Sequence, residues 1–126
     1  MRRVFKTKAF TRWARKAGLG NVALCGAILE MASGKIDADL GGRILKKRVA
    51  LPGMGKSGST RTLVATNKSS RWYFVFGFEK NERDNIEPDE LAALKRLAAD
   101  LLKLTDSQLE IAIEAGALTE ICHDRH

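Results

Sequence analysis

The sequence has few of the residues that build metal centres or disulfide frameworks. It contains two cysteines and two histidines among 126 residues. Cys25 lies within an apolar helical pattern and Cys122 lies near the C-terminus, and this spacing matches neither a disulfide framework nor a metal site. We therefore expect two free thiols in a reducing compartment, and hence a cytoplasmic protein.

Long apolar runs are absent as well. No stretch of about 18 consecutive apolar residues occurs, and the charged residues at the N-terminus lead into further charge. We expect neither a signal peptide nor a membrane span. The length fits one small domain over residues 1–126, in which residues 88–126 form a C-terminal helical extension.

Familiar catalytic and cofactor motifs are also missing. His123 and His126 lie in the last four residues without a third ligand at helical spacing, so we expect no metal site. The string Gly55-Lys56-Ser57 resembles the end of a phosphate-binding P-loop, but the first glycine of that motif would fall at Ala50 and a strand follows. We therefore exclude a nucleotide triphosphate site and expect no cofactor.

Positive charge is abundant and unevenly distributed. The formal net charge is +7, with 14 Lys and Arg against 3 Asp and Glu in residues 1–61, and 8 against 12 in residues 62–126. This asymmetry predicts a basic face that meets nucleic acid or another acidic partner. A solvated surface is the alternative.

Hydrophobic periodicity and capping residues predict an α+β fold, in which a small antiparallel sheet is packed by an N-terminal helical hairpin and a C-terminal helix. Asn21 is expected to cap the second helix, and Trp72, Phe74, Phe76 and Phe78 are expected on one face of a central strand. The expected strands are 4–6, 43–50, 59–67 and 71–78, the expected helices are 8–17, 22–32, 88–103 and 106–115, and a short apolar tail covers 118–121.

Several cations are expected to converge at one end of this sheet. Lys46 and Arg48 alternate onto the same face of their strand. A tight turn at residues 68–70 pairs positions whose numbers sum to about 138 or 139, which brings Arg61 close to Phe78 and Lys80. A second basic cluster, which includes Arg83, follows directly.

Convergent cations suit phosphodiester chemistry. Attack by a ribose 2′-oxygen places negative charge on the phosphoryl oxygens, and preorganised cations stabilise that charge more in the transition state than in the ground state. Crowding lowers the pKa of a lysine, so Lys46 or Lys80 can serve as general base. Simple phosphate binding without catalysis is the alternative. The candidate catalytic residues are Lys46, Arg48, Arg61, Lys80 and Arg83, and the candidate RNA-binding residues are Lys47, Lys56 and Asn81.

Four motifs carry a resemblance to a known family. They are the residues 36–42 (IDADLGG), 46–50 (KKRVA), 55–61 (GKSGSTR) and 77–86 (GFEKNERDNI). In this order and spacing they resemble the RelE/ParE superfamily of bacterial toxins from type II toxin-antitoxin modules, especially its RelE and HigB branches, over about residues 2–104. The resemblance implies an mRNA interferase that cleaves messenger RNA on the ribosome without metal, leaves 2′,3′-cyclic phosphate ends, inhibits translation, and is neutralised by a cognate antitoxin, often a helix-turn-helix protein.

Two positions depart from the RelE pattern. Asn81 stands where RelE has a catalytic arginine, and Glu87 stands near its catalytic tyrosine. HigB-like relatives tolerate an asparagine at this position, which implies that the charge is distributed over the remaining cations. Two alternatives share the fold: a ParE-like gyrase inhibitor, and a non-catalytic RNA-binding or regulatory domain.

Overall fold

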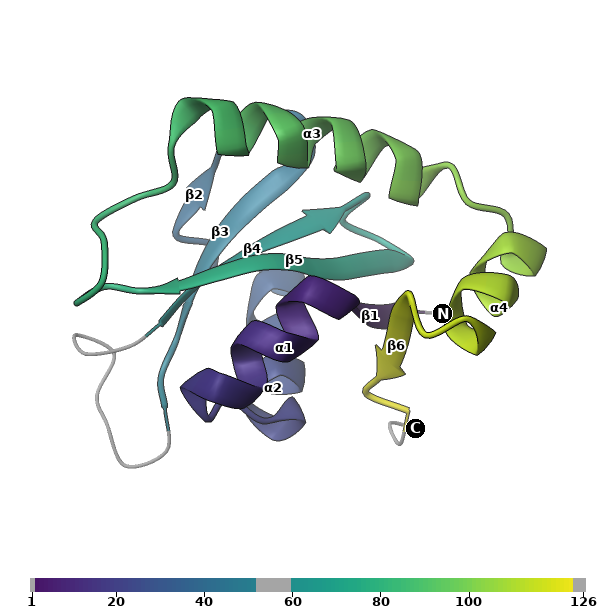
Figure 1. Ribbon diagram of the computed structural model, residues 1–126, viewed down its shortest axis with the longest axis horizontal. Helices are drawn as coiled ribbons and strands as arrows, with labels where there is room; N and C mark the ends of the chain where they lie inside the picture. The colour runs from purple at the N-terminus through teal and green to yellow at the C-terminus, as the bar shows by residue number, and fades with distance from the viewer. Residues whose placement is uncertain (1, 52–59, 124–126) are drawn as a thin grey trace.

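The computed structural model describes residues 2–51 and 60–123. These residues form a six-stranded sheet with α1 and α2 on one face and α3 on the other (Figure 1). The strands lie in the order β2-β3-β4-β5-β1-β6. In chain order the elements are β1 (Arg3–Thr7), α1 (Lys8–Ala17), α2 (Asn21–Ala32), β2 (Ala38–Asp39), β3 (Ile44–Val49), β4 (Thr60–Thr66), β5 (Arg71–Glu79), α3 (Pro88–Leu102), α4 (Asp106–Glu114) and β6 (Leu118–Ile121).

The expected α+β architecture is confirmed, with one difference in strand direction. All neighbouring strands are antiparallel except β1 and β5, which run parallel. The long connection between these two strands permits the parallel arrangement, because it includes the helical hairpin and three further strands. The last part of the chain is not only helical, since β6 pairs with β1 at the edge of the sheet.

The helix boundaries follow the capping residues closely. Thr7 accepts a hydrogen bond from the Phe10 backbone at the start of α1, and Gly18 ends that helix with a φ of +77°. The expected cap at Asn21 is wrong by one residue, because Gly20 is the N-cap of α2. The Asn21 side chain instead accepts a hydrogen bond of 2.9 Å from Lys6 Nζ. Lys6 is buried, so its amino group needs an acceptor within the protein.

The pairing of β4 with β5 confirms the predicted register. Arg61 lies opposite Phe78, whereas Val64 lies opposite Phe74, so the position numbers sum to 139 and then to 138. The change marks a bulge between Leu63 and Val64, which shifts the alternation of side chains. The expectation of four aromatic side chains on one face is therefore wrong: Trp72 and Phe74 belong to the core beneath the sheet, whereas Phe76 packs against the core beneath α3.

The expectation of free thiols is also wrong. Cys25 of α2 and Cys122 after β6 form a disulfide with an S–S distance of 2.07 Å. The pairing of β6 with β1 carries the end of the chain past α2, which brings together two residues 97 positions apart. The argument for a reducing compartment therefore loses its basis in the cysteines. None of the helices in the described ranges is long and apolar enough to span a bilayer.

Candidate functional site: a cationic face at one end of the sheet

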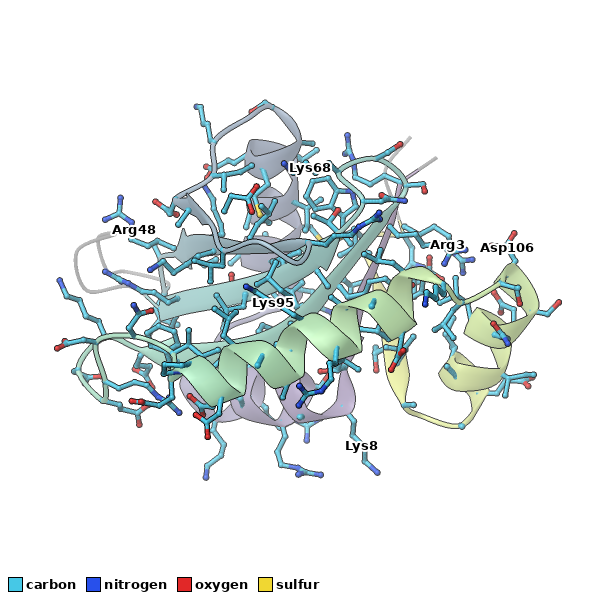
Figure 2. All side chains as sticks on the ribbon, turned by 90° about the horizontal axis from the view of Figure 1, so that it is seen from above. Arg3, Lys8, Arg48, Lys68, Lys95 and Asp106 are labelled. Atoms are coloured by element: carbon cyan, nitrogen blue, oxygen red, sulfur yellow. A yellow bond between two sulfur atoms is a disulfide. The ribbon has the colours of Figure 1, made fainter. Side chains whose placement is uncertain are left out.

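The first part of the candidate site lies on β3 and β4. Arg48 and Arg61 are direct cross-strand neighbours, and Lys46 lies opposite Leu63. Directly opposed residues of antiparallel strands project from the same face. That face is the one covered by α3. Ile44 projects to the same side of β3 as Lys46 and Arg48, and Leu63 projects to the same side of β4 as Arg61. Both Ile44 and Leu63 pack in the core beneath α3. Lys46, Arg48 and Arg61 therefore share one face, and Arg48 lies at the end of the sheet opposite Arg3 and Asp106 (Figure 2).

Arg83 reaches the same face from the turn after β5. Its guanidinium lies over the rings of Phe76 and Phe78, with distances of 5.4 and 5.9 Å from Cζ to the ring centroids. Phe78 is the cross-strand neighbour of Arg61, so the row Arg48, Arg61, Phe78 and Arg83 is continuous. We call this row, together with Lys46, the cationic face.

Two carboxylates fix the orientation of its arginines. Arg83 binds Glu90 of α3 through both terminal amino groups, with N···O distances of 2.6 and 3.2 Å. Hydrogen bonds from Arg83, and then from the Glu87 backbone, lower the pKa of Glu90. The Glu90 carboxylate raises the pKa of Arg83 in return. Because Glu90 lies in the first turn of α3, the N-terminus of that helix holds Arg83 in place.

Arg48 is oriented by Asp37. The Arg48 backbone N–H donates to one Asp37 oxygen over 2.7 Å, and Nε donates to the other over 3.2 Å. Burial raises the pKa of Asp37, but the hydrogen bonds and charge of Arg48 outweigh it, so the net shift is downward. Among the described residues neither terminal amino group of Arg48 has a hydrogen-bond partner. Arg48 can thus be held by Asp37 and still offer two amino groups to a phosphate.

These ion pairs remain open to water. The Arg48 and Asp37 side chains are 44% and 26% exposed, and those of Arg83 and Glu90 are 37% and 33% exposed. Ion pairs at this level of exposure are weak, because water screens the attraction between the two charges. A bound phosphodiester can therefore compete for both arginines, and the carboxylates position them without removing them from use.

Lys47, Lys80 and Asn81 are predicted site residues that are not members of this row. Lys47 points to the opposite face, where it is buried, binds Glu30 over 2.7 Å and donates to the Lys35 carbonyl over 3.0 Å. Lys80 and Asn81 are exposed in the turn after β5. Lys56, with most of the glycine-rich loop, lies outside the described residues.

The aromatic residues that flank β5 differ in their availability. Trp72 and Tyr73 are buried, and their polar atoms donate to the carbonyls of Ser69 and Leu101. They belong to the core and cannot stack on a nucleotide base. Phe76 is only partly buried and lies beneath the Arg83 guanidinium, so it is an aromatic candidate next to the cationic face for contact with a base.

Sequence reasoning missed the partners of the cations. Asp37, Phe76 and Glu90 each contact a predicted arginine, but none was assigned to the site. The string Glu87-Pro88-Asp89-Glu90 does carry a signal, because a glutamate three residues after an N-cap is held at the helix start. The pairing of Asp37 with Arg48 depends on β2 lying beside β3, which local sequence does not indicate.

The chemistry available to this arrangement is electrostatic. Guanidinium groups from two strands and one turn can bind a phosphodiester and stabilise charge that develops on its oxygens. Over residues 2–51 and 60–123, no cluster of three His, Cys, Asp or Glu could hold a metal ion.

Comparison with protein-family models gives a match over most of the chain. A family model described as the RelE toxin of the RelE/RelB toxin-antitoxin system matches residues 2–121. A search of curated proteins finds no match.

Proposed function

The chain belongs to the RelE toxin family of toxin-antitoxin systems, and we propose that this toxin is a metal-independent endoribonuclease of the HigB-like branch that cleaves messenger RNA on the ribosome. Cleavage of translated messages inhibits protein synthesis. The family implies a cognate antitoxin, and we propose a helix-turn-helix protein for this role. Because ribosomes are in the cytoplasm, the proposed toxin acts there.

One observation carries the proposal: three arginines from separate segments, Arg48, Arg61 and Arg83, converge on one face. Attack of the ribose 2′-oxygen on phosphorus forms the 2′,3′-cyclic phosphate and breaks the bond to the 5′-oxygen. The 2′-hydroxyl proton leaves to a base, for which Lys46 or Lys80 is the candidate, and the 5′-oxygen gains a proton as it departs. The arginines stabilise the phosphoryl charge of the transition state.

Among the described residues, the carboxylates beside these arginines are Asp37 and Glu90, which are held in ion pairs with Arg48 and Arg83. A site that offers mainly cations and a lysine base fits a ribosome-dependent enzyme. Where the toxin supplies mainly charge, a large part of the rate enhancement must come from holding the 2′-oxygen in line with the scissile bond. A message held in the ribosomal A site is already constrained in this way. Free RNA in solution lacks that constraint and is expected to be cut slowly.

The proposal is tested by inducing expression of the chain and mapping messenger RNA ends. We expect cuts within translated regions and 2′,3′-cyclic phosphate ends. Arg61→Ala should reduce cleavage by about 100-fold or more, since removing one transition-state donor typically costs this much. Arg96→Ala is the matched control, because Arg96 is an exposed cation on α3 outside the cationic face.

Three outcomes would contradict the proposal. Intact transcripts and unchanged growth with soluble protein present would exclude the nuclease. DNA damage without RNA cleavage would select the gyrase inhibitor. RNA binding that Arg61→Ala leaves unchanged, without cleavage by either protein, would select a non-catalytic RNA-binding domain.

A further inference from the structure

The outward face of α2 is apolar and has no partner among the described residues. Val22 is 90% exposed and Leu29 is 62% exposed. Gly26 and Ala32 are also exposed, and the spacing of these four positions places them on one side of the helix. The opposite side supplies Leu24, Ala27, Ile28 and Met31 to the core. A surface helix usually carries polar residues on its outer side, so this apolar stripe is a candidate interaction surface.

Gly26 gives an independent reason to expect a partner on this stripe. Glycine within a helix is unfavourable by about 1 kcal/mol relative to alanine. Nothing in the fold requires it here, since an added Cβ would meet no atom within 4 Å and the backbone has no positive φ. Between Val22 and Leu29 this side of the helix therefore presents backbone without a side chain. A position without a side chain allows the backbone of another molecule to approach closely.

The surroundings of the stripe are basic. Glu30 is the first acidic residue of the chain, and it binds Lys47. At the start of α2, Lys6 contacts Asn21, and burial together with the charge of Arg15 lowers the pKa of Lys6. At the other end, Lys35 is exposed after the last turn.

The outer side of α1 adds further cations. Its exposed side includes Lys8, Arg12, Arg15 and Lys16, none of which has an ion-pair partner among the described residues. The labelled Lys8 side chain points away from the body of the protein, on the side of α1 that faces away from α2 (Figure 2). The helical side of the sheet, which carries α1 and α2, is therefore basic, and an apolar stripe on it fits a partner whose apolar residues are flanked by Asp and Glu.

We propose that the outward face of α2, formed by Val22, Gly26, Leu29 and Ala32, is the docking surface for an acidic amphipathic helix of the cognate antitoxin. This proposal rests on the toxin function proposed above. Because α2 packs beneath the sheet and the cationic face lies above it, the two surfaces are on opposite sides. Antitoxin binding and RNA cleavage should therefore respond to different substitutions.

The test measures binding of the protein encoded by the adjacent reading frame to the full-length chain by titration calorimetry. Both the reference and the variants carry Arg61→Ala, so that toxicity does not limit expression. We expect Val22→Glu with Leu29→Glu to weaken binding by about 100-fold, as loss of a central hot spot does. The matched pair Val22→Lys with Leu29→Lys should weaken it less, because lysine does not repel an acidic partner.

Two more variants separate docking from folding. Gly26→Gln replaces glycine by a better helix former, so its melting temperature should not fall, yet binding should weaken by about 10-fold or more. Ile111→Glu is the control, since Ile111 is 65% exposed on α4, and its affinity should stay within about twofold of the reference. In a chain with Arg61 intact, the Val22 and Leu29 variants should still cleave RNA.

Several results would overturn the proposal. One is unchanged antitoxin affinity in the glutamate variant, and another is the absence of any binding to the reference chain. Loss of ribosome association with intact antitoxin binding would assign α2 to RNA instead. A dimer that the glutamate variant converts to a monomer, at unchanged antitoxin affinity, would assign it to self-association. RNA cleavage by the active chain is measured separately, so failure of the nuclease proposal remains distinguishable.

Discussion

Loss of the Cys25–Cys122 disulfide should lower the stability of the protein by several kcal/mol without abolishing the fold. The bond joins residues 97 positions apart. In the chain-entropy model, closing a loop of about 100 residues contributes about 4.7 kcal/mol, and measured values are usually about 2–4 kcal/mol. We therefore expect a loss of about 3 kcal/mol, against a total of about 5–15 kcal/mol for a domain of this kind.

Urea unfolding measures this loss directly. With an m value of about 2 kcal/mol/M, a loss of about 3 kcal/mol moves the midpoint down by about 1.5 M. The midpoint is compared for the oxidised protein, for the same protein in dithiothreitol, and for a Cys25→Ala variant that cannot form the bond. The reduced protein and the variant should agree. Identical midpoints in all three samples, with both thiols open to alkylation before reduction, would refute the reasoning.

The result also bears on where the toxin acts. Cytoplasmic thiols are normally kept reduced. A nuclease that works on ribosomes must then fold with Cys25 and Cys122 reduced, and a residual stability of a few kcal/mol is sufficient for that.

Three other substitutions test the packing and the ion pairs. Gly77→Ala should destabilise by about 1–3 kcal/mol, because the added Cβ would clash with the Trp13 ring; a lower melting temperature checks this. Lys47→Ala should cost about 1–3 kcal/mol in urea unfolding, since it removes a buried partner of Glu30, whereas Lys47→Met keeps the volume and should cost less. Hydrogen bonds from Arg3 lower the pKa of Glu120 below its ordinary 4.5, so this carboxylate stabilises the fold above that pH and loses its effect as the pH falls through the lowered value. Glu120→Gln should therefore be less stable than wild type at pH 6, and the difference in urea midpoint should shrink towards pH 3.

Local sequence signals were sufficient for most of the elements and for one register. Thr7 and Gly18 bound α1 as predicted, because caps act within a single turn. The turn at residues 68–70 sets the pairing of Arg61 with Phe78, because a short connection fixes which residues meet. The bulge beside Leu63 was not predictable in this way. Because β5 is apolar on both faces, its hydrophobic pattern does not indicate which residues point to which face, or where the alternation shifts.

Features that depend on distant segments were missed. The disulfide requires β6 beside β1, and the predicted apolar tail gave no sign of that pairing. Lys47 was expected to meet RNA, but alternation along β3 turns it to the face opposite Arg48, where Glu30 of α2 binds it. The three arginines could be proposed as site residues because their charge is visible in sequence. Their carboxylate partners could not be proposed in this way, because Asp37 precedes β2 and Glu90 lies on α3, both in other segments of the chain.

The central claim is that Arg48, Arg61 and Arg83 act together on one phosphodiester. The most direct measurement is the single-turnover rate of messenger RNA cleavage on programmed ribosomes for each alanine variant and each pair. Each single variant should lose about 100-fold or more, and the loss in a pair should be smaller than the product of the two single losses, as for groups that stabilise one transition state. Wild-type rates in Arg61→Ala, or independent multiplicative losses in every pair, would contradict the account.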